Sequence, residues 1–233
     1  MFVAKTDAQN LLKGFIDTLG GKLKETNEFL ASLADEDDWS FVIKSHALIE
    51  ATVTNLITSA LGDDRIYLTI ERLPLSESQA GKIIFAKQLG VLEKPQIRFI
   101  KWYSELRNQL VHKVDNIEFN FLQYWASLDA NQKKSWKDTI DWARESTEPS
   151  QDFCDLIEKQ PKTALWLSIL TLIGICEVNA SQAILLRKIN NTSEETTKKH
   201  IKRQEELIVL QSQLIKEQAA LLEQGISGNG SSR

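Results

Sequence analysis

Apolar residues recur along most of the chain at three- and four-residue steps, which is the spacing of one face of an α-helix. The strict alternation of apolar and polar residues that marks β-strands is nearly absent. Thr6, Ser76, Asp129 and Thr192 each precede a Gln or Glu by three residues, as at a capping-box helix start. The pattern therefore predicts an all-α protein. Helices are expected at 7–19, 22–34, 38–61, 76–89, 95–113, 117–128, 130–146, 150–159, 162–189 and 193–224.

Glycines and prolines mark the expected helix ends, notably Gly20-Gly21, Gly62 and Gly90. The helix at 38–61 has a wide apolar face, as expected of the central helix of a bundle. The turn from Gly90 to Pro95 is short, and short turns favour antiparallel neighbours. We therefore expect an up-and-down helical bundle.

The helix expected at 162–189 is apolar almost all round in its first half, where residues 164–176 read ALWLSILTLIGIC. A helix that spans a bilayer needs about 20 apolar residues. Glu177 and Asn179 end this run before that length is reached. A buried core helix is therefore expected here, and no membrane association.

The end of the chain has a different pattern. Residues 193–224 are rich in Glu, Lys and Gln, with apolar residues in two columns at seven-residue spacing and a polar Gln column beside them. This amphipathic helix is expected either to pack back on the bundle or to join two copies as a short coiled coil. We expect a bundle at 1–190, this helix at 191–224 and a flexible tail at 225–233. The columns are Leu207, Leu214 and Leu221, and Ile201, Ile208, Ile215 and Leu222.

Composition narrows the function classes. The 233 residues carry a net charge of −4, which argues against a broad nucleic-acid-binding face but leaves room for a local phosphate site. Cys154 and Cys176 have no CxxC spacing and no neighbouring histidine, so neither a metal site nor any cofactor is expected. The N-terminus lacks a signal-peptide pattern, and we expect a cytoplasmic protein. No P-loop, dinucleotide-binding fingerprint or Gly-x-Ser-x-Gly sequence occurs.

The segment Arg107-Asn108-Gln109-Leu110-Val111-His112 is the strongest candidate site. On a helix, Phe99, Tyr103, Leu106 and Leu110 form the core-facing stripe, and Lys101, Glu105, Asn108 and His112 form the opposite one. Arg107 projects about 100° from Asn108 and about 140° from His112. Histidine exchanges protons near neutral pH, and an arginine fork matches phosphate oxygens. One chain is therefore expected to hold half of a site unless the helix end frays.

Other polar groups have ordinary structural explanations. His46 and Glu50 are one turn apart on the 38–61 helix and can support the same cleft, although a structural pair on the helix flank is the simpler interpretation. The acidic run at 35–38 is expected to cap that helix rather than bind metal. His200 lies in a basic cluster that is more typical of a solvated helix end than of an RNA contact.

Three stretches carry a resemblance to a known family. They are FVIKSHALIEATVTNLI at 41–57, KIIFAKQLGVL at 82–92 and ELRNQLVH at 105–112. The segment 41–121, roughly a third of the chain, resembles HEPN domains, which are helical bundles with an Arg-x(4–6)-His motif. Its layout, including Phe119-Asn120-Phe121, is also similar to that of the mannitol operon repressor group.

The resemblance implies a HEPN-like bundle and a homodimer in which two Arg-His motifs meet and cleave RNA without a metal. His112 would then exchange a proton with the 2′-hydroxyl or the leaving oxygen, Arg107 would bind the phosphate, and Asn108 would orient either of them. His46, Glu50 and Glu105 would be supporting residues. Such a protein could be a toxin or phage-defence effector with an antitoxin partner. The alternative is a non-catalytic HEPN-like regulator that binds a protein partner.

Overall fold

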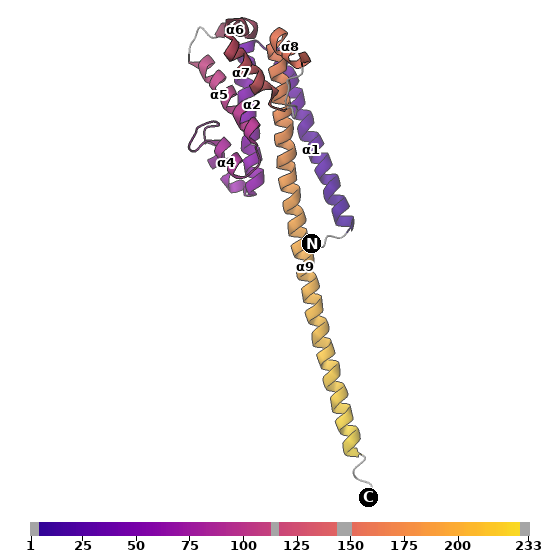
Figure 1. Ribbon diagram of the computed structural model, residues 1–233. Helices are drawn as coiled ribbons and strands as arrows, with labels where there is room; N and C mark the ends of the chain where they lie inside the picture. The colour runs from indigo at the N-terminus through magenta and orange to yellow at the C-terminus, as the bar shows by residue number, and fades with distance from the viewer. Residues whose placement is uncertain (1–4, 113–116, 144–150, 229–233) are drawn as a thin grey trace. The chain divides into compact units, whose positions relative to one another are not determined.

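The computed structural model describes residues 5–112, 117–143 and 151–228, apart from the side chains at 5, 6, 8, 210 and 212–228 (Figure 1). All regular elements in these ranges are helices, which confirms the all-α prediction. They are α1 (Lys5–Ala34), α2 (Asp38–Leu61), η1 (Asp64–Ile66), α3 (Tyr67–Glu71), α4 (Lys82–Gln88), α5 (Lys94–Val111), α6 (Phe121–Ser127), α7 (Ala130–Ile140), η3 (Asp141–Ala143), α8 (Gln151–Lys159) and α9 (Pro161–Gly228).

The chain forms two compact units. The larger, which we call the body, comprises residues 12–186. Helix α2 lies at its centre and contacts α3, α4 and α5, while α7 and η3 pack on α5. The Trp39 indole contacts the carbonyl of Leu110, and Ser45 contacts Tyr103, so α2 and α5 run antiparallel. The core of these helices consists of Phe41, Val42, Ile49, Val53, Leu56 and Ile57 of α2, Ile83 and Ala86 of α4, and Phe99, Ile100, Tyr103, Leu106 and Leu110 of α5.

Helix α2 has the predicted bounds because both of its ends are strongly capped. Asp37 is the N-cap, and its carboxylate accepts a hydrogen bond from the Ser40 amide at 2.8 Å. The side chain and the backbone of Ser40 both lower the pKa of Asp37. Gly62 ends the helix with a φ of 76°, a left-handed conformation that glycine adopts without strain. The acidic run at 35–38 therefore caps this helix, as predicted.

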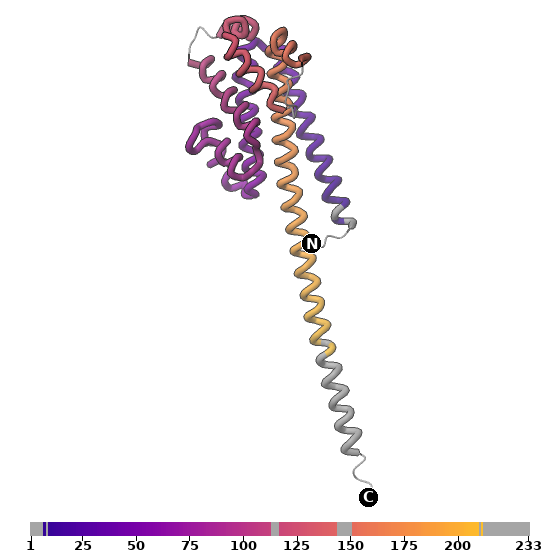
Figure 2. The backbone as a smooth tube through the Cα atoms, viewed as in Figure 1, coloured from indigo at the N-terminus to yellow at the C-terminus, as the bar shows by residue number. Residues whose placement is uncertain are grey.

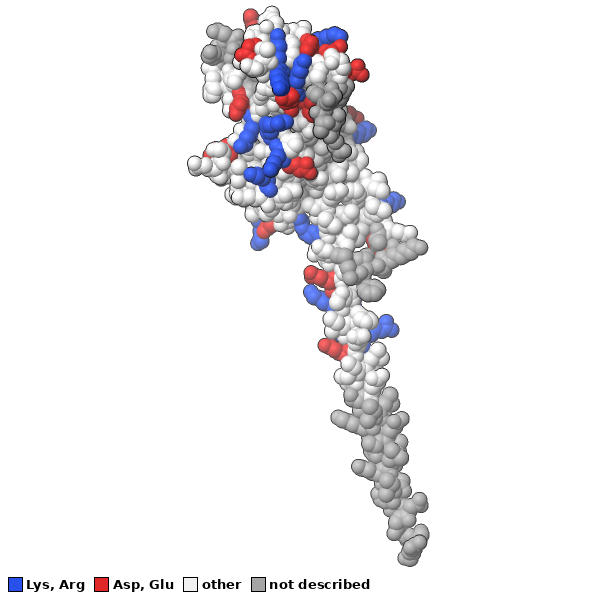
Figure 3. Space-filling view, in the orientation of Figure 1, with Lys and Arg blue, Asp and Glu red and all other residues white. Residues whose placement is uncertain are grey.

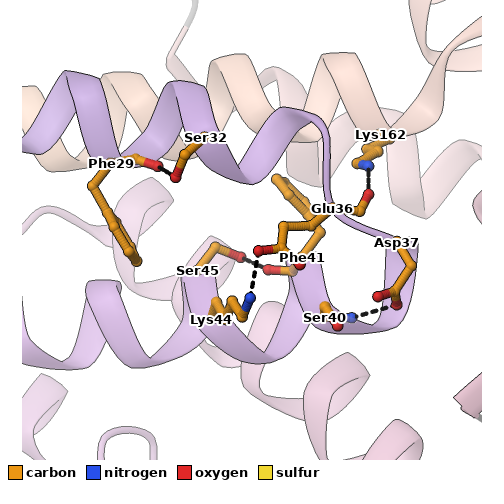
Figure 4. A network of polar contacts seen from close by, with 9 residues as sticks. All are labelled: Phe29, Ser32, Glu36, Asp37, Ser40, Phe41, Lys44, Ser45 and Lys162. Carbon is orange, nitrogen blue, oxygen red and sulfur yellow. Dashed lines mark hydrogen bonds and ion pairs between the residues drawn. The ribbon is translucent and has the colours of Figure 1, made fainter.

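The junction between α1 and α2 is tied to α9 by polar contacts (Figure 4). The Lys162 ammonium of α9 donates to the carbonyl of Glu36, and the Glu36 carboxylate in turn pairs with Lys44 of α2. The Trp166 indole donates to the carbonyl of Leu30 at 2.8 Å, and Lys22 lies 3.8 Å from Glu177. Within the body, α1 and the first part of α9 therefore lie side by side and antiparallel (Figure 2).

The predicted break at Gly20-Gly21 is wrong, because α1 continues through both glycines as one helix. Glycine in a helix costs about 1 kcal/mol relative to alanine, which weakens a helix without ending it. A glycine ends a helix when it adopts a left-handed conformation, as Gly62 does.

The predicted break at 190–192 is also wrong, because α9 is one helix from Pro161 to Gly228. Thr192 has the spacing of a capping residue, but its hydroxyl donates to the carbonyl of Lys188 at 2.9 Å. Thr196 and Thr197 bond backward in the same way, to Thr192 and Ser193. Such bonds satisfy the hydroxyl inside a continuous helix, so the capping-box spacing of Thr192 does not mark a helix start.

The region between α2 and α5 differs most from the expected 76–89 helix. The Glu77 carboxylate accepts hydrogen bonds from the amides of Gln79 and Ala80, which holds 78–80 in a turn. Helix α4 therefore begins only at Lys82. The short α3 was not predicted, and only Ile70 of that helix is buried.

Further along, the predicted capping box of Asp129 and Gln132 is confirmed at the start of α7. The helices expected at 117–160 correspond to α6, α7 and α8.

Among the described residues one helix, α9, is long and apolar enough over Pro161–Val209 to cross a membrane, judged by length and composition. Within the body, Ala164, Leu165, Ile169 and Leu172 of this helix are buried in the hydrophobic core. This placement agrees with the core helix that the sequence predicts for 164–176.

The smaller unit contains residues 5–11 and the part of α9 from Arg187 onward. In the apolar columns of this helix, the side chains of Ile201, Leu207 and Ile208 are 49%, 52% and 62% exposed in the single chain. The side chains of the remaining column residues, from Leu214 onward, lie outside the described part of the structure. The flexible tail expected from residue 225 is wrong for residues 225–228, which belong to α9, and residues 229–233 lie outside the described residues. Packing of this helix on the bundle and pairing with a second copy both stay predictions.

Candidate functional site

Helix α5 presents its two predicted stripes to opposite environments. Phe99, Tyr103, Leu106 and Leu110 are all buried in the core. Glu105, Asn108 and His112 are exposed, and Lys101 is half-buried. His112 is therefore not a core histidine, as predicted, and its imidazole is accessible from solvent.

Arg107 turns toward Asn108 rather than pointing straight out from its own position on the helix. Its Nη1 donates a hydrogen bond to the Asn108 side-chain oxygen at 3.0 Å, and the residue is half-buried. The guanidinium thus reaches the flank that carries Asn108, which narrows the expected 100° separation of these two side chains. Arginine has five N–H donors, so this bond leaves further donors of the guanidinium that can bind a phosphate.

His112 is the C-cap residue of α5, with φ −83° and ψ −8°, a right-handed helical conformation. The last helical residue is Val111, so the fraying that would bring His112 toward Arg107 does not extend into α5. The end of α5 is tied to the start of α2, because the Trp39 indole donates to the carbonyl of Leu110 at 3.4 Å. One protomer accordingly offers Arg107 and Asn108 on one flank and His112 at the tip.

His46 lies beneath this face, between α2 and α5. It is 9% exposed, and its Nε2 is 3.1 Å from the Ser104 hydroxyl. The Ser104 hydroxyl donates its own proton to the carbonyl of Ile100. Its oxygen therefore accepts the hydrogen bond from His46, which is neutral with its proton on Nε2. Burial lowers the pKa of His46 to about 4, with a further contribution from the charge of Arg107 and an opposing one from Glu50. His46 therefore lies within the electrostatic reach of the candidate site.

Glu50 has a different partner from the one expected. The sequence suggested a pair with His46, but Glu50 accepts a hydrogen bond from the Lys82 ammonium of α4 at 2.7 Å. The Lys82 side chain is 1% exposed and that of Glu50 is 36% exposed. The sequence analysis did not single out Lys82. Its place beside Ile83 and Ile84 at the start of an apolar helix was the signal that it points inward.

His46 gives the protein a pH-dependent stability. The unfolded pKa is near 6.5 and the folded pKa is about 4, so the unfolded state binds the extra proton as pH falls through this window. Lowering the pH from 7.5 to 5 should therefore remove about 2 kcal/mol of stability. Urea unfolding at the two pH values measures this loss. The control His46→Gln keeps a donor toward Ser104 and should lose much less; equal losses would contradict this origin.

The described residues contain no group of three or more His, Cys, Asp or Glu side chains placed to hold a metal ion. No protein-family model, no curated protein and no solved structure matches the chain in comparisons with known proteins. The candidate site is therefore defined by its geometry, with Arg107, Asn108 and His112 on the accessible side of α5 and His46, Glu50 and Lys82 behind it.

Proposed function

We propose that the protein is a HEPN-like, metal-independent endoribonuclease that acts as a homodimer. The observation that carries this proposal is the accessible face of α5, where the Arg107 guanidinium is turned onto Asn108 and His112 stands at the helix end. The core-facing stripe of the same helix is fully packed, so the backbone beneath these side chains is rigidly held. A rigid helix therefore carries the side chains that would bind a phosphate and exchange a proton.

The reaction uses the 2′-hydroxyl of RNA as the nucleophile. Its oxygen attacks the adjacent phosphorus, the bond from phosphorus to the 5′-oxygen breaks, and a 2′,3′-cyclic phosphate forms. The 2′-hydroxyl loses its proton and the leaving 5′-oxygen gains one, and a histidine is suited to either transfer. His112 takes this role, and Arg107 stabilises the charge that develops on the phosphate oxygens.

Two protomers are part of the proposal because the parts of the site diverge within one chain. Arg107 and His112 project about 140° apart on an ideal helix, and His112 is the C-cap, directly after the last helical residue, Val111. A two-fold axis close to the end of α5 brings the His112 of one protomer toward the Arg107 of the other. The exposed Ile201 and Leu207 on α9 favour association with a partner helix as well.

A cleavage assay tests the proposal. The full chain, incubated with single-stranded RNA in EDTA, should generate fragments ending in a 2′,3′-cyclic phosphate. The matched substrate with 2′-O-methyl groups lacks the nucleophile and should stay intact. Absence of cleavage with RNA of varied sequence, or cleavage only when Mg²⁺ is added, would contradict this function. A non-cleaving protein that associates through α9 would instead fit the HEPN-like regulator, which acts through a protein partner.

A further inference from the structure

A groove of about 440 Å³ lies between α4, α5 and α7. Its cations are Lys87 at the end of α4 and Lys94, Arg98 and Lys101 along α5. Glu105 is the one carboxylate among its lining residues. Figure 3 shows Lys and Arg side chains gathered on this face of the body. The local charge is therefore opposite in sign to the net charge of −4 of the whole chain.

The cations of α5 are in line with the candidate site. Lys94, Arg98, Lys101, Glu105, Asn108 and His112 follow one another at steps of 4, 3, 4, 3 and 4 residues. On a helix these positions fall within an arc of about 80°, so they form one stripe along α5. Cations recur about once per turn, every ~5.4 Å, and the stripe ends at His112. A chain of phosphates bound in the groove is thereby directed toward the candidate site.

The other surfaces of the groove suit a nucleotide. Trp102 lines it, and this ring is held by edge-to-face packing on Trp136, with centroids 5.1 Å apart. Across the groove, Ser135 and Thr139 of α7 offer hydroxyl groups. Arg98 donates to the carbonyl of Asp138 at 2.9 Å, which ties α5 to α7 along this wall. A fixed aromatic ring among cations is the arrangement with which proteins hold single-stranded nucleic acid.

We infer that this groove binds the sugar-phosphate backbone of single-stranded RNA and leads the strand along α5 to His112. The choice of RNA rests on the proposed ribonuclease function; the binding of a polyanion rests on the groove alone. Lys87, Lys94 and Lys101 contact phosphates, and Trp102 supports a base. Glu105 lies between these cations and Asn108, and its negative charge weakens the binding of the strand.

Binding is measured with the full-length protein and a fluorescent 2′-O-methyl oligonucleotide, which lacks the nucleophile needed for cleavage. The double variant Lys94→Gln/Lys101→Gln should bind about tenfold more weakly at moderate salt. The slope of log affinity against log salt should fall by about 1.4, since each phosphate contact on a single strand contributes about 0.7. Glu105→Gln should strengthen binding several-fold, a change of opposite sign that a loss of folding would not produce.

The matched control is Lys13→Gln/Lys24→Gln, which removes the same charge from exposed positions on α1. Equal binding by the groove variant and this control would overturn the inference. So would competition by polyglutamate as effective as that by RNA of equal charge, because the groove would then fit an acidic protein segment. Groove-dependent binding without cleavage of ordinary RNA would support the groove and reject the nuclease. Cleavage of RNA by a groove variant whose binding is unchanged would support the nuclease and reject the groove.

Discussion

His112→Ala is expected to lower the rate of RNA cleavage at least a hundredfold, because general acid–base catalysis contributes about 10²–10⁴. The side chain is exposed at the end of α5, so the substitution should change the free energy of unfolding by no more than about 0.5 kcal/mol. Binding of a 2′-O-methyl oligonucleotide should be nearly unchanged. Initial cleavage rates, unfolding curves and binding isotherms together separate a chemical role from a structural one.

His200→Ala is the matched control for this experiment. His200 is also an exposed histidine, but it lies on α9 in the smaller unit. Its removal should leave cleavage within about twofold of the original rate if the chemistry belongs to His112. A His112→Ala protein that still cleaves at the original rate would remove His112 from the mechanism.

The divergence of Arg107 and His112 gives a second expectation for the same site. If the site is shared across a dimer, neither His112→Ala nor Arg107→Ala cleaves RNA alone, but a mixed dimer contains one intact Arg107–His112 combination. Mixing the two variants under conditions of subunit exchange should restore a measurable part of the activity. Failure to recover activity in dimers shown to be mixed would place the whole site in one chain.

Glu50→Gln is expected to cost about 3 kcal/mol of stability at neutral pH, the largest effect on folding that we foresee for a single polar substitution. The Lys82 ammonium is nearly inaccessible to water and lies 2.7 Å from the Glu50 carboxylate. Removing the carboxylate leaves the buried ammonium without its counter-charge; for a fully buried pair such losses are about 3–5 kcal/mol, and the 36% exposure of Glu50 places this one at the lower end. Chemical denaturation at fixed protein concentration measures this effect.

Lys82→Met is the informative comparison, because it removes the buried charge and keeps an apolar side chain of similar length. The remaining Glu50 carboxylate is 36% exposed and can be hydrated, so the cost should be only about 1 kcal/mol. Combining the two substitutions should recover part of the loss seen in Glu50→Gln. If Lys82→Met proved the more damaging change, the buried ammonium would not be the source of the effect.

Local signals in the sequence predicted those elements whose ends are chemically marked. Helix α2 begins at the Asp37 cap and ends at Gly62 in a left-handed conformation, and both residues are evident from the sequence. The same kinds of signal failed at Gly20-Gly21 and at Thr192. A glycine or a threonine tolerates the helix interior when nothing else forces an end, and that decision depends on neighbouring helices.

The candidate site divides in a similar way. Helical periodicity alone predicts that Asn108 and His112 are exposed, since the core-facing stripe of α5 is unambiguous. The turn of Arg107 toward Asn108, the hydrogen bond from His46 to Ser104 and the burial of Lys82 were not predicted. Each depends on a side-chain conformation or on residues distant in sequence, which no periodicity encodes.

The first turn of α2 also has a consequence for the position of His112. Trp39 is bonded to the carbonyl of Leu110, near the end of α5, and its neighbour Asp38 accepts a hydrogen bond from the amide of Phe121, where α6 begins, at 2.8 Å. Two adjacent residues thus anchor the chain on both sides of 113–116, across separations of 71 and 83 positions in sequence. The start of α2 therefore helps to hold His112 in position, although it takes no part in the chemistry. Substitutions that remove the Trp39 or Asp38 hydrogen bond are therefore expected to shift His112.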